Sequence, residues 1–356
     1  MKILFAAVWV ISVLFTSCNH NSSSEENEGL KDVTGLYVGT AVNYRQVTTR
    51  DTIRSIIVNE FSSITPENEM KMYSVLSGPG EYRWNGVDTM VAFARRNNLR
   101  LFGHCLIWHS GTPGWLTEME HDSTSLSNFM KEYIHTYVSK YKNDVDGWDV
   151  VNEAITDSAG TMRKTFWYNL LGESYIDQAF RAAHEADPEA VLFINDYNNE
   201  RDTVKMNATI DLINRLKSRG VPVSGIGLQM HTRMDIPDEM IALNLKKAAE
   251  TGLQVHLSEV DVIFNRHNDQ PGGGEQIYPE LTEEMLQRQG EKYRKIAEMY
   301  RDIVPENQQY GITVWGFNDR TSWIPGFFGM KDWPTLYDEN LQKKPAYYGF
   351  KEGLSE

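Results

Sequence analysis

The stretch WDVVNEA, from Trp148 to Ala154, begins as a buried β-strand and ends with an amide and a carboxylate. Val150 and Val151 are apolar, whereas Asn152 and Glu153 follow directly after them. A glutamate at the end of a core strand is unfavourable unless it is paired, solvated or used in chemistry. The meaning of Glu153 therefore depends on whether other strands of the chain end in the same way.

Other short apolar runs occur along the chain, separated by longer segments with apolar residues at three- and four-residue spacing. Two of these segments, residues 126–141 and 286–304, have the periodicity of amphipathic helices. Regular alternation of strands and helices predicts a parallel sheet, and about eight repeats predict an α/β fold closed into a single (β/α)8 TIM barrel. The predicted strands are residues 36–42, 61–65, 99–108, 146–151, 191–195, 225–230, 254–260 and 310–317.

The active sites of TIM barrels lie at the C-terminal ends of the strands. In this sequence nearly every predicted strand ends in polar or aromatic side chains, which favours a functional site over a set of separate turn contacts. Glu153 closes the fourth predicted strand and Glu259 closes the seventh, so the two face each other across the mouth of a closed ring. Opposed carboxylates suit glycoside hydrolysis, in which one protonates the leaving oxygen while the other attacks or stabilises the anomeric carbon.

Composition excludes several other classes of function. The formal net charge is −14, and such an acidic surface repels nucleic acid, so a neutral partner is expected. The chain has two cysteines, Cys18 and Cys105, which is too few for a disulfide framework or a thiolate-rich zinc site. No close pair of histidines lies on the first predicted strand and no G-x-S-x-G motif occurs, which argues against metal-dependent and serine hydrolysis. We expect no metal and no cofactor.

The N-terminus has the pattern of an export signal. Lys2 precedes an apolar run, residues 3–15, which is shorter than the roughly 20 residues that span a bilayer. The run is followed by Thr-Ser-Cys ending at Cys18, which resembles the signal of bacterial lipoproteins, although that pattern usually has leucine where this chain has Phe15. An ordinary secretory signal and an uncut membrane anchor are the alternatives.

The lipoprotein pattern sets the expected organisation of the chain. We expect a signal peptide over residues 1–17, a lipidated polar tether over residues 18–29 and one catalytic domain over residues 30–356. The protein would then be exported and held in the outer membrane by acyl chains on Cys18, facing the periplasm or the cell surface. We expect it to be a monomer.

The strand-end motifs resemble, in the correct order, those of glycoside hydrolase family 10, the endo-β-1,4-xylanases. These motifs are ITPENEMK, GHCLIWH, WDVVNEA, NDYN, GIGLQMH, LSEVDV and TVWGF, and the resemblance runs from about Leu36 to the closing KPAYYGF. It implies that Glu153 is the acid/base, that Glu259 is the nucleophile, and that internal xylosidic bonds of xylan are cleaved with retention of configuration. SEVDV departs from the family at the residues that flank Glu259, which alters packing but not the reacting groups.

The same resemblance assigns supporting roles. His231 and Asp261 match a pair that orients and ionises the nucleophile, since a nearby hydrogen-bonded cation favours the carboxylate form. Gln229 is expected in the same network as His231 and Asp261, and Asn152 can donate a hydrogen bond to the sugar 2-hydroxyl. The remaining substrate-binding residues that it implies are Glu67, Asn68, Lys71 and His104 on the glycone side, the aromatic residues Trp108, Trp315 and Trp323, and Tyr197 on the aglycone side.

Two other functions fit the same constellation. A broader β-1,4-glycanase would carry the same residues, and a non-catalytic glycan-binding lipoprotein could use the same cleft, although the presence of both Glu153 and Glu259 argues against it. Residues 264–284 form a long loop with glycines and prolines that either shapes the aglycone end or covers the barrel rim. Trp148 and Trp167 are expected in the core.

Overall fold

The computed structural model describes residues 28–157 and 159–355. The expected signal peptide, Cys18 and nearly all of the tether lie outside these described residues. Among the residues that are described, no helix is both long enough and apolar enough to cross a membrane.

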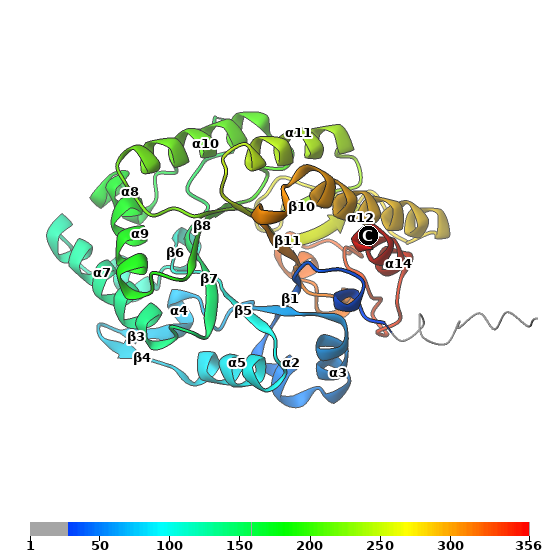
Figure 1. Cartoon of the computed structure of the whole chain (residues 1–356), viewed down its shortest axis with the longest axis horizontal. Helices are drawn as coiled ribbons and strands as arrows, with labels where there is room; N and C mark the ends of the chain where they lie inside the picture. Colours follow the sequence, from blue (N-terminus) through cyan, green and yellow to red (C-terminus); the bar gives the residue numbers. More distant parts are fainter. Residues whose placement is uncertain (1–27, 158, 356) are drawn as a thin grey trace, which may run out of the picture.

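Within the described part of the chain, eight parallel strands close into a barrel, and helices surround it (Figure 1). Strand β14 pairs with both β1 and β11, and β11 pairs with β9, which completes the ring. The predicted (β/α)8 barrel is confirmed. Its strands are β1 (Val38–Val42), β2 (Ser63–Pro66), β5 (Arg100–Gly103), β7 (Val145–Asn152), β8 (Val191–Asp196), β9 (Gly225–Leu228), β11 (Gln254–Ile263) and β14 (Gln309–Val314).

The predicted strand over residues 99–108 is wrong in its extent, because two separate strands occupy this run. Strand β5 ends at Gly103, and β6 (Ile107–Trp108) begins after a break. Gly103 pairs with Trp148, and Ile107 pairs with Val151. Between these two pairs the chain of β5 and β6 advances by four residues, whereas β7 advances by three. The extra residue interrupts the ladder. Gly103 is required there, because a Cβ atom would lie 2.2 Å from the Trp148 ring.

Helices alternate with the strands as the periodicity predicts. Residues 126–141 and 286–304 correspond to α7 (Ser123–Lys140) and α12 (Glu283–Ile303). Side-chain caps start both helices, since Asp122 accepts from the backbone of Thr124 and Ser125, and Thr282 accepts from that of Met285. The other helices are α2 (Tyr44–Thr49), α3 (Asp51–Glu60), α4 (Met72–Val75), α5 (Asn85–Arg96), α6 (Gly114–Glu118), α8 (Phe166–Leu171), α9 (Ser174–Ala186), α10 (Thr203–Ser218), α11 (Asp238–Ala249), α13 (Ile324–Phe328) and α14 (Pro345–Leu354).

Several short strands lie outside the eight barrel strands. Strand β10 (His231–Arg233) pairs with the far end of β11 and extends the sheet at the C-terminal end of that strand. Two hairpins stand outside the barrel, formed by β3 (Leu76–Gly78) with β4 (Glu81–Tyr82) and by β12 (Arg266–His267) with β13 (Gly274–Glu275). The second hairpin belongs to the long loop that follows β11.

Side chains fill the barrel and the space between its strands and helices. Inside the barrel, Phe102, Phe193, His256 and Tyr310 pack in edge-to-face pairs with ring centroids 4.7–5.8 Å apart. Trp148 and Trp167 are each 1% exposed, which confirms that both are core residues. The filled interior leaves only the loops and strand ends to form a site.

Candidate active site

A cleft of about 610 Å³ opens at the C-terminal ends of the barrel strands. The structure brings nearly all of the predicted site residues in the described part of the chain into its lining, with Asp261 directly behind His231. The predicted residues that line the cleft are Glu67, Asn68, Lys71, His104, Trp108, Asn152, Glu153, Tyr197, Gln229, His231, Glu259, Trp315 and Trp323.

Glu259 lies on β11 at the bottom of the cleft. Its Oε1 accepts a hydrogen bond from Asn195 Nδ2 at 3.0 Å, and its Oε2 lies 3.3 Å from His231 Nε2. Burial raises the pKa of this carboxyl, but the imidazoles of His104 and His231 outweigh burial and hold the pKa below its usual range. Glu259 is therefore ionised at neutral pH, as a nucleophile must be.

His231 is held by a carboxylate on the neighbouring strand. Its Nδ1 lies 2.9 Å from Asp261 Oδ2, and strand pairing places these two residues directly opposite each other. Burial alone would lower the pKa of His231, whereas Asp261 and Glu259 together raise it to about 10. Trp323 Nε1 donates to the same Asp261 oxygen at 2.9 Å. The imidazolium thus remains charged beside the nucleophile.

Glu153 reaches the cleft because the backbone leaves strand geometry at this residue. Successive side chains of a regular strand point to opposite faces, so Asn152 and Glu153 could not both face the cleft in a continuous strand. Glu153 has φ +58°, a left-handed conformation that turns its side chain toward the cleft. Its Oε1 lies 3.4 Å from Gln229 Nε2, and its Oε2 lies 3.8 Å from His109 Nε2.

The groups beside Glu153 are mostly neutral. Burial lowers the pKa of His109 to about 4, so this imidazole is uncharged at neutral pH. The Asn152 amide oxygen accepts from Asn195 Nδ2 and from Gln229 Nε2, each at 3.1 Å. Because both of these bonds use the oxygen, the Asn152 Nδ2 group is left to donate toward Glu153 Oε1 at 3.5 Å and toward a sugar in the cleft.

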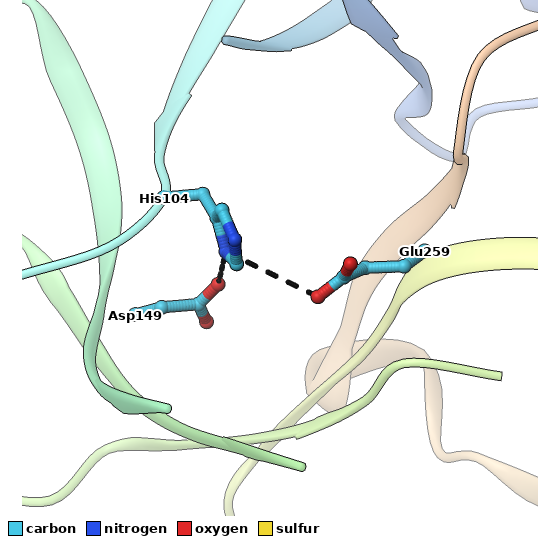
Figure 2. A group of neighbouring side chains, drawn as sticks. All are labelled: His104, Asp149 and Glu259. Carbon is cyan, nitrogen blue, oxygen red and sulfur yellow. Dashed lines mark hydrogen bonds and ion pairs between the residues drawn. The ribbon is translucent and has the colours of Figure 1, made fainter. Parts of the chain in front are cut away.

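A second histidine–aspartate pair, His104 with Asp149, lies beside Glu259 (Figure 2). His104 Nδ1 is 2.8 Å from Asp149 Oδ2 and 4.0 Å from Glu259 Oε1. Burial raises the pKa of Asp149 to about 6, against the effect of His104. The donor atoms of these three residues lie within 4.8 Å of one another, as in some metal sites, but His104 and Asp149 already bond to each other and Glu259 accepts from Asn195. The group is accounted for as a hydrogen-bonded framework.

Polar and aromatic side chains line the cleft together around Lys71 and Trp108. Lys71 Nζ lies 3.5 Å from Asn68 Oδ1 and 4.9 Å from the centre of the Trp108 ring. Trp315 packs edge-on against His104, with centroids 5.2 Å apart. Burial raises the pKa of Glu67. Flat aromatic faces beside hydrogen-bonding groups suit the apolar faces and hydroxyls of a pyranose ring.

Another part of the cleft is built around Tyr197. Its hydroxyl donates to Asp157 at 2.5 Å and accepts from Arg163 at 2.9 Å. The ammonium group of buried Lys205 lies 3.6 Å from the Tyr197 ring centre. These contacts fix the ring where it lines the cleft.

The loop that follows β11 lines the cleft rather than only covering the rim. Residues 267 and 269–271 line the cleft. Asp269 Oδ2 accepts from Asn198 and Arg201, each at 3.2 Å, which joins this loop to the one after β8. The course of the loop depends on these long-range contacts, and no local sequence pattern indicated it.

Several residues of the site were not among those predicted. Asn195 joins Glu259 to Asn152, and Asp149 supports His104. Both lie within quoted motifs, Asn195 as the first residue of NDYN and Asp149 as the second of WDVVNEA, so their membership of strand-end motifs was an available signal. Arg163 lies in the loop between β7 and α8, where no sequence signal distinguished it.

A TIM barrel with two carboxylates toward the C-terminal ends of its fourth and seventh strands, one of them held ionised by neighbouring histidines, has the architecture of a glycoside hydrolase. Comparison with known proteins identifies the family: the chain belongs to glycosyl hydrolase family 10, whose model matches residues 27–353.

Relatives of known name cover nearly the whole chain. Endo-1,4-beta-xylanase B of Thermotoga neapolitana is 36% identical over 330 residues, which is 92% of this chain and 91% of the relative. The crystal structure of xylanase 10B from Thermotoga maritima superposes with a TM-score of 0.83 at 36% identity, covering 92% of this chain and 98% of the other. Xylanase 10B from Thermotoga petrophila, solved in complex with xylobiose, superposes with a TM-score of 0.83 at 36% identity, covering 91% of this chain and 95% of the other.

Proposed function

We propose that this protein is an endo-1,4-β-xylanase that cleaves internal β-1,4-xylosidic bonds of xylan with retention of configuration. The observation that carries the proposal is the pairing of an ionised Glu259, flanked by His231 and Asn195, with Glu153 at the opposite strand end. Family membership and the names of the relatives support xylan as the substrate.

The reaction proceeds by two displacements. In the first, a Glu259 oxygen bonds to the anomeric carbon while the glycosidic C–O bond breaks and Glu153 gives its proton to the leaving oxygen. In the second, Glu153 takes a proton from water, the water oxygen bonds to the anomeric carbon and Glu259 leaves as a carboxylate. Glu153 is then protonated again, and the configuration has been inverted twice.

The surrounding residues have distinct roles in this proposal. Asn152 donates to the sugar 2-hydroxyl, a contact that strengthens as positive charge develops at the anomeric carbon. Glu67, Asn68, Lys71 and His104 bind the glycone hydroxyls, and Trp108, Trp315 and Trp323 pack on sugar faces. Tyr197 receives the aglycone sugar. His231 and Asp261 keep the nucleophile ionised.

Product analysis tests the reaction. Xylan should yield short xylo-oligosaccharides, and NMR of early products should show the β-anomer before mutarotation. An α-anomer would contradict retention, and a purified protein that binds xylan without cleaving it would favour the non-catalytic alternative. Comparable kcat/KM on xylo- and cello-oligosaccharides would favour the broader β-1,4-glycanase.

We also propose that the protein is an outer-membrane lipoprotein, facing the periplasm or the cell surface, with residues 1–17 removed and Cys18 lipidated. The Thr-Ser-Cys sequence and the polar segment after it support this proposal. Replacing Cys18 by Ala should move the protein from the membrane to a soluble fraction, because acyl chains provide the anchoring energy. A wild-type protein that is soluble in its own cell envelope would contradict it. We propose that the anchored enzyme is a monomer, which sedimentation of the detergent-solubilised protein can test.

A further inference from the structure

The turn that carries the acid/base has an unusual backbone conformation. Glu153 has φ +58°, which crowds the Cβ of any residue other than glycine. Such a conformation persists only where the surrounding structure over-determines it. The same turn aims the Glu153 carboxyl at the cleft, so whatever holds this turn also sets the position of the proton that the first displacement needs.

One residue bonds to three successive carbonyl groups of this turn. Arg163 Nε donates to the Glu153 carbonyl at 3.1 Å, and Arg163 Nη2 donates to the Ile155 carbonyl at 3.1 Å. Between them, the backbone N–H of Arg163 donates to the Ala154 carbonyl at 2.8 Å. On the opposite side of the turn, the Glu153 N–H donates to the Asn195 carbonyl at 2.9 Å.

The Arg163 guanidinium is itself fixed in place. Its Nη2 also donates to the Tyr197 hydroxyl at 2.9 Å, and that hydroxyl bonds to Asp157. Lys205, which is buried, bridges Asp157 at 2.9 Å and Asp196 at 2.8 Å. A planar guanidinium can bond to two carbonyls and a phenol oxygen at once, whereas the compact ammonium of lysine cannot reproduce that fork.

We propose that Arg163 is a positioning residue for general acid catalysis, which holds the left-handed turn at residues 153–155 and thereby places the Glu153 carboxyl beside the leaving oxygen. The inference rests on the proposed acid/base role of Glu153. It predicts that loss of the Arg163 side chain impairs proton transfer more than it impairs nucleophilic attack, because no contact of Arg163 reaches Glu259.

Leaving groups of different acidity separate these two effects. For Arg163→Met, kcat/KM on xylopentaose should fall by about 10- to 100-fold, the scale expected when a general acid is misplaced. On 2,4-dinitrophenyl β-xylobioside the loss should stay below about 3-fold, because dinitrophenolate leaves without a proton. The ratio kcat/KM is the appropriate measure because it reports the first displacement. Arg163→Lys keeps the charge but not the fork, should show the same pattern, and carries the test if the methionine variant does not fold.

Two controls make the outcome decisive. Arg233→Met removes another arginine near the cleft, which is paired with Asp235. The Arg233 side chain is 15% exposed, against 23% for that of Arg163. This variant should leave the ratio of kcat/KM between the two substrates unchanged. Glu153→Ala, measured in parallel, gives the ratio for complete loss of the acid. A folded Arg163 variant that loses equal activity on both substrates, or none on xylopentaose, would overturn the inference. An equal loss on both substrates in Glu153→Ala would instead overturn the role of Glu153.

Discussion

Glu153 and Glu259, the proposed catalytic pair, occupy contrasting surroundings, although they line the same cleft. The Glu259 side chain is 5% exposed and lies between two histidine–aspartate pairs, His231 with Asp261 and His104 with Asp149. The Glu153 side chain is 14% exposed and its neighbours are an amide and a neutral imidazole, Gln229 and His109. The side chains beside the Glu259 carboxyl include charged groups, whereas those beside the Glu153 carboxyl are uncharged and Arg163 bonds to the Glu153 backbone carbonyl.

The difference corresponds to the two tasks of the reaction. A nucleophile must remain ionised throughout, so cationic partners at short distance are an advantage. An acid/base must lose and regain a proton in every turnover, and a permanent cation in direct contact would disfavour its protonated form. The amide and the imidazole beside the Glu153 carboxyl are uncharged, and the Arg163 guanidinium bonds to the backbone carbonyl of Glu153. Each of the following changes tests one side of this contrast.

The largest effect is expected from removing each carboxylate in turn. Glu259→Ala should lower kcat/KM on every substrate by about 10⁴-fold or more, because no other group forms the glycosyl intermediate. Glu153→Ala should spare substrates with activated aryl leaving groups while nearly abolishing cleavage of xylan. Steady-state kinetics on xylan and on an activated aryl glycoside tests both expectations. An equal loss for both variants on the activated glycoside would refute the assignment of Glu259 as nucleophile and Glu153 as acid/base.

Removing the cation beside Glu259 should give the next largest effect. In His231→Asn, burial of Glu259 and the opposing effect of His104 remain while the hydrogen bond and charge of His231 are lost, so the pKa of Glu259 rises and the acid limb of the pH profile of kcat/KM moves to higher pH. Activity should fall by about 100-fold near pH 5 and by less near pH 8. The same loss at every pH would indicate that His231 only shapes the cleft.

Stability should respond to pH through the same histidine. The pKa of His231 rises from its ordinary 6.5 to about 10 in the folded protein, so its contribution to the free energy of unfolding is complete below pH 6.5 and is lost as the pH approaches 10. Between these values the thermal midpoint of the wild type should fall more steeply than that of His231→Asn. Parallel curves for the two proteins would show that His231 is not charged when folded.

A smaller effect is expected from replacing Gln229, an uncharged residue beside Glu153. Gln229→Leu removes the donor to Asn152 and Glu153, two hydrogen bonds of 3.1 and 3.4 Å, at nearly constant volume. The loss in kcat/KM on xylan should be roughly 3- to 30-fold, the range for one or two uncharged hydrogen bonds. The acid limb of the pH profile should stay in place, because the hydrogen bond between the two residues, from the Glu259 N–H to the Gln229 carbonyl at 2.9 Å, is a backbone bond that the substitution leaves in place. Displacement of that limb would contradict the division between the two environments.

The smallest effect is expected where the cleft wall meets the charged pair. Trp323→Phe keeps an aromatic wall but removes the bond from Nε1 to Asp261, so kcat should fall only a few-fold. The preference for xylo- over cello-oligosaccharides should persist in this variant and weaken in Trp323→Ala, since crowding by the ring excludes the hydroxymethyl group of a glucan. Kinetics on both oligosaccharide series measures this, and an unchanged preference in Trp323→Ala would remove the steric argument.

Much of the site was predictable because its parts are local in sequence. Polar residues directly after apolar runs, such as Glu153 and Glu259, identify themselves as strand ends, and a closed barrel must bring strand ends to one face. The break between β5 and β6 was not predictable, since it depends on a one-residue difference in register against β7. The path of the loop after β11 likewise depends on Asp269 meeting Asn198 and Arg201.

The sequence by itself determined the barrel, the catalytic face and the two carboxylates, because hydrophobic periodicity sets which segments are strands and topology then fixes where their ends lie. Only the tertiary structure decided how each carboxylate is controlled. The charge of His231 requires Asp261 across a strand pair, and the aim of Glu153 requires a left-handed turn bonded to Arg163. Both depend on desolvated contacts at distances of about 3 Å between separate elements, which no linear pattern records.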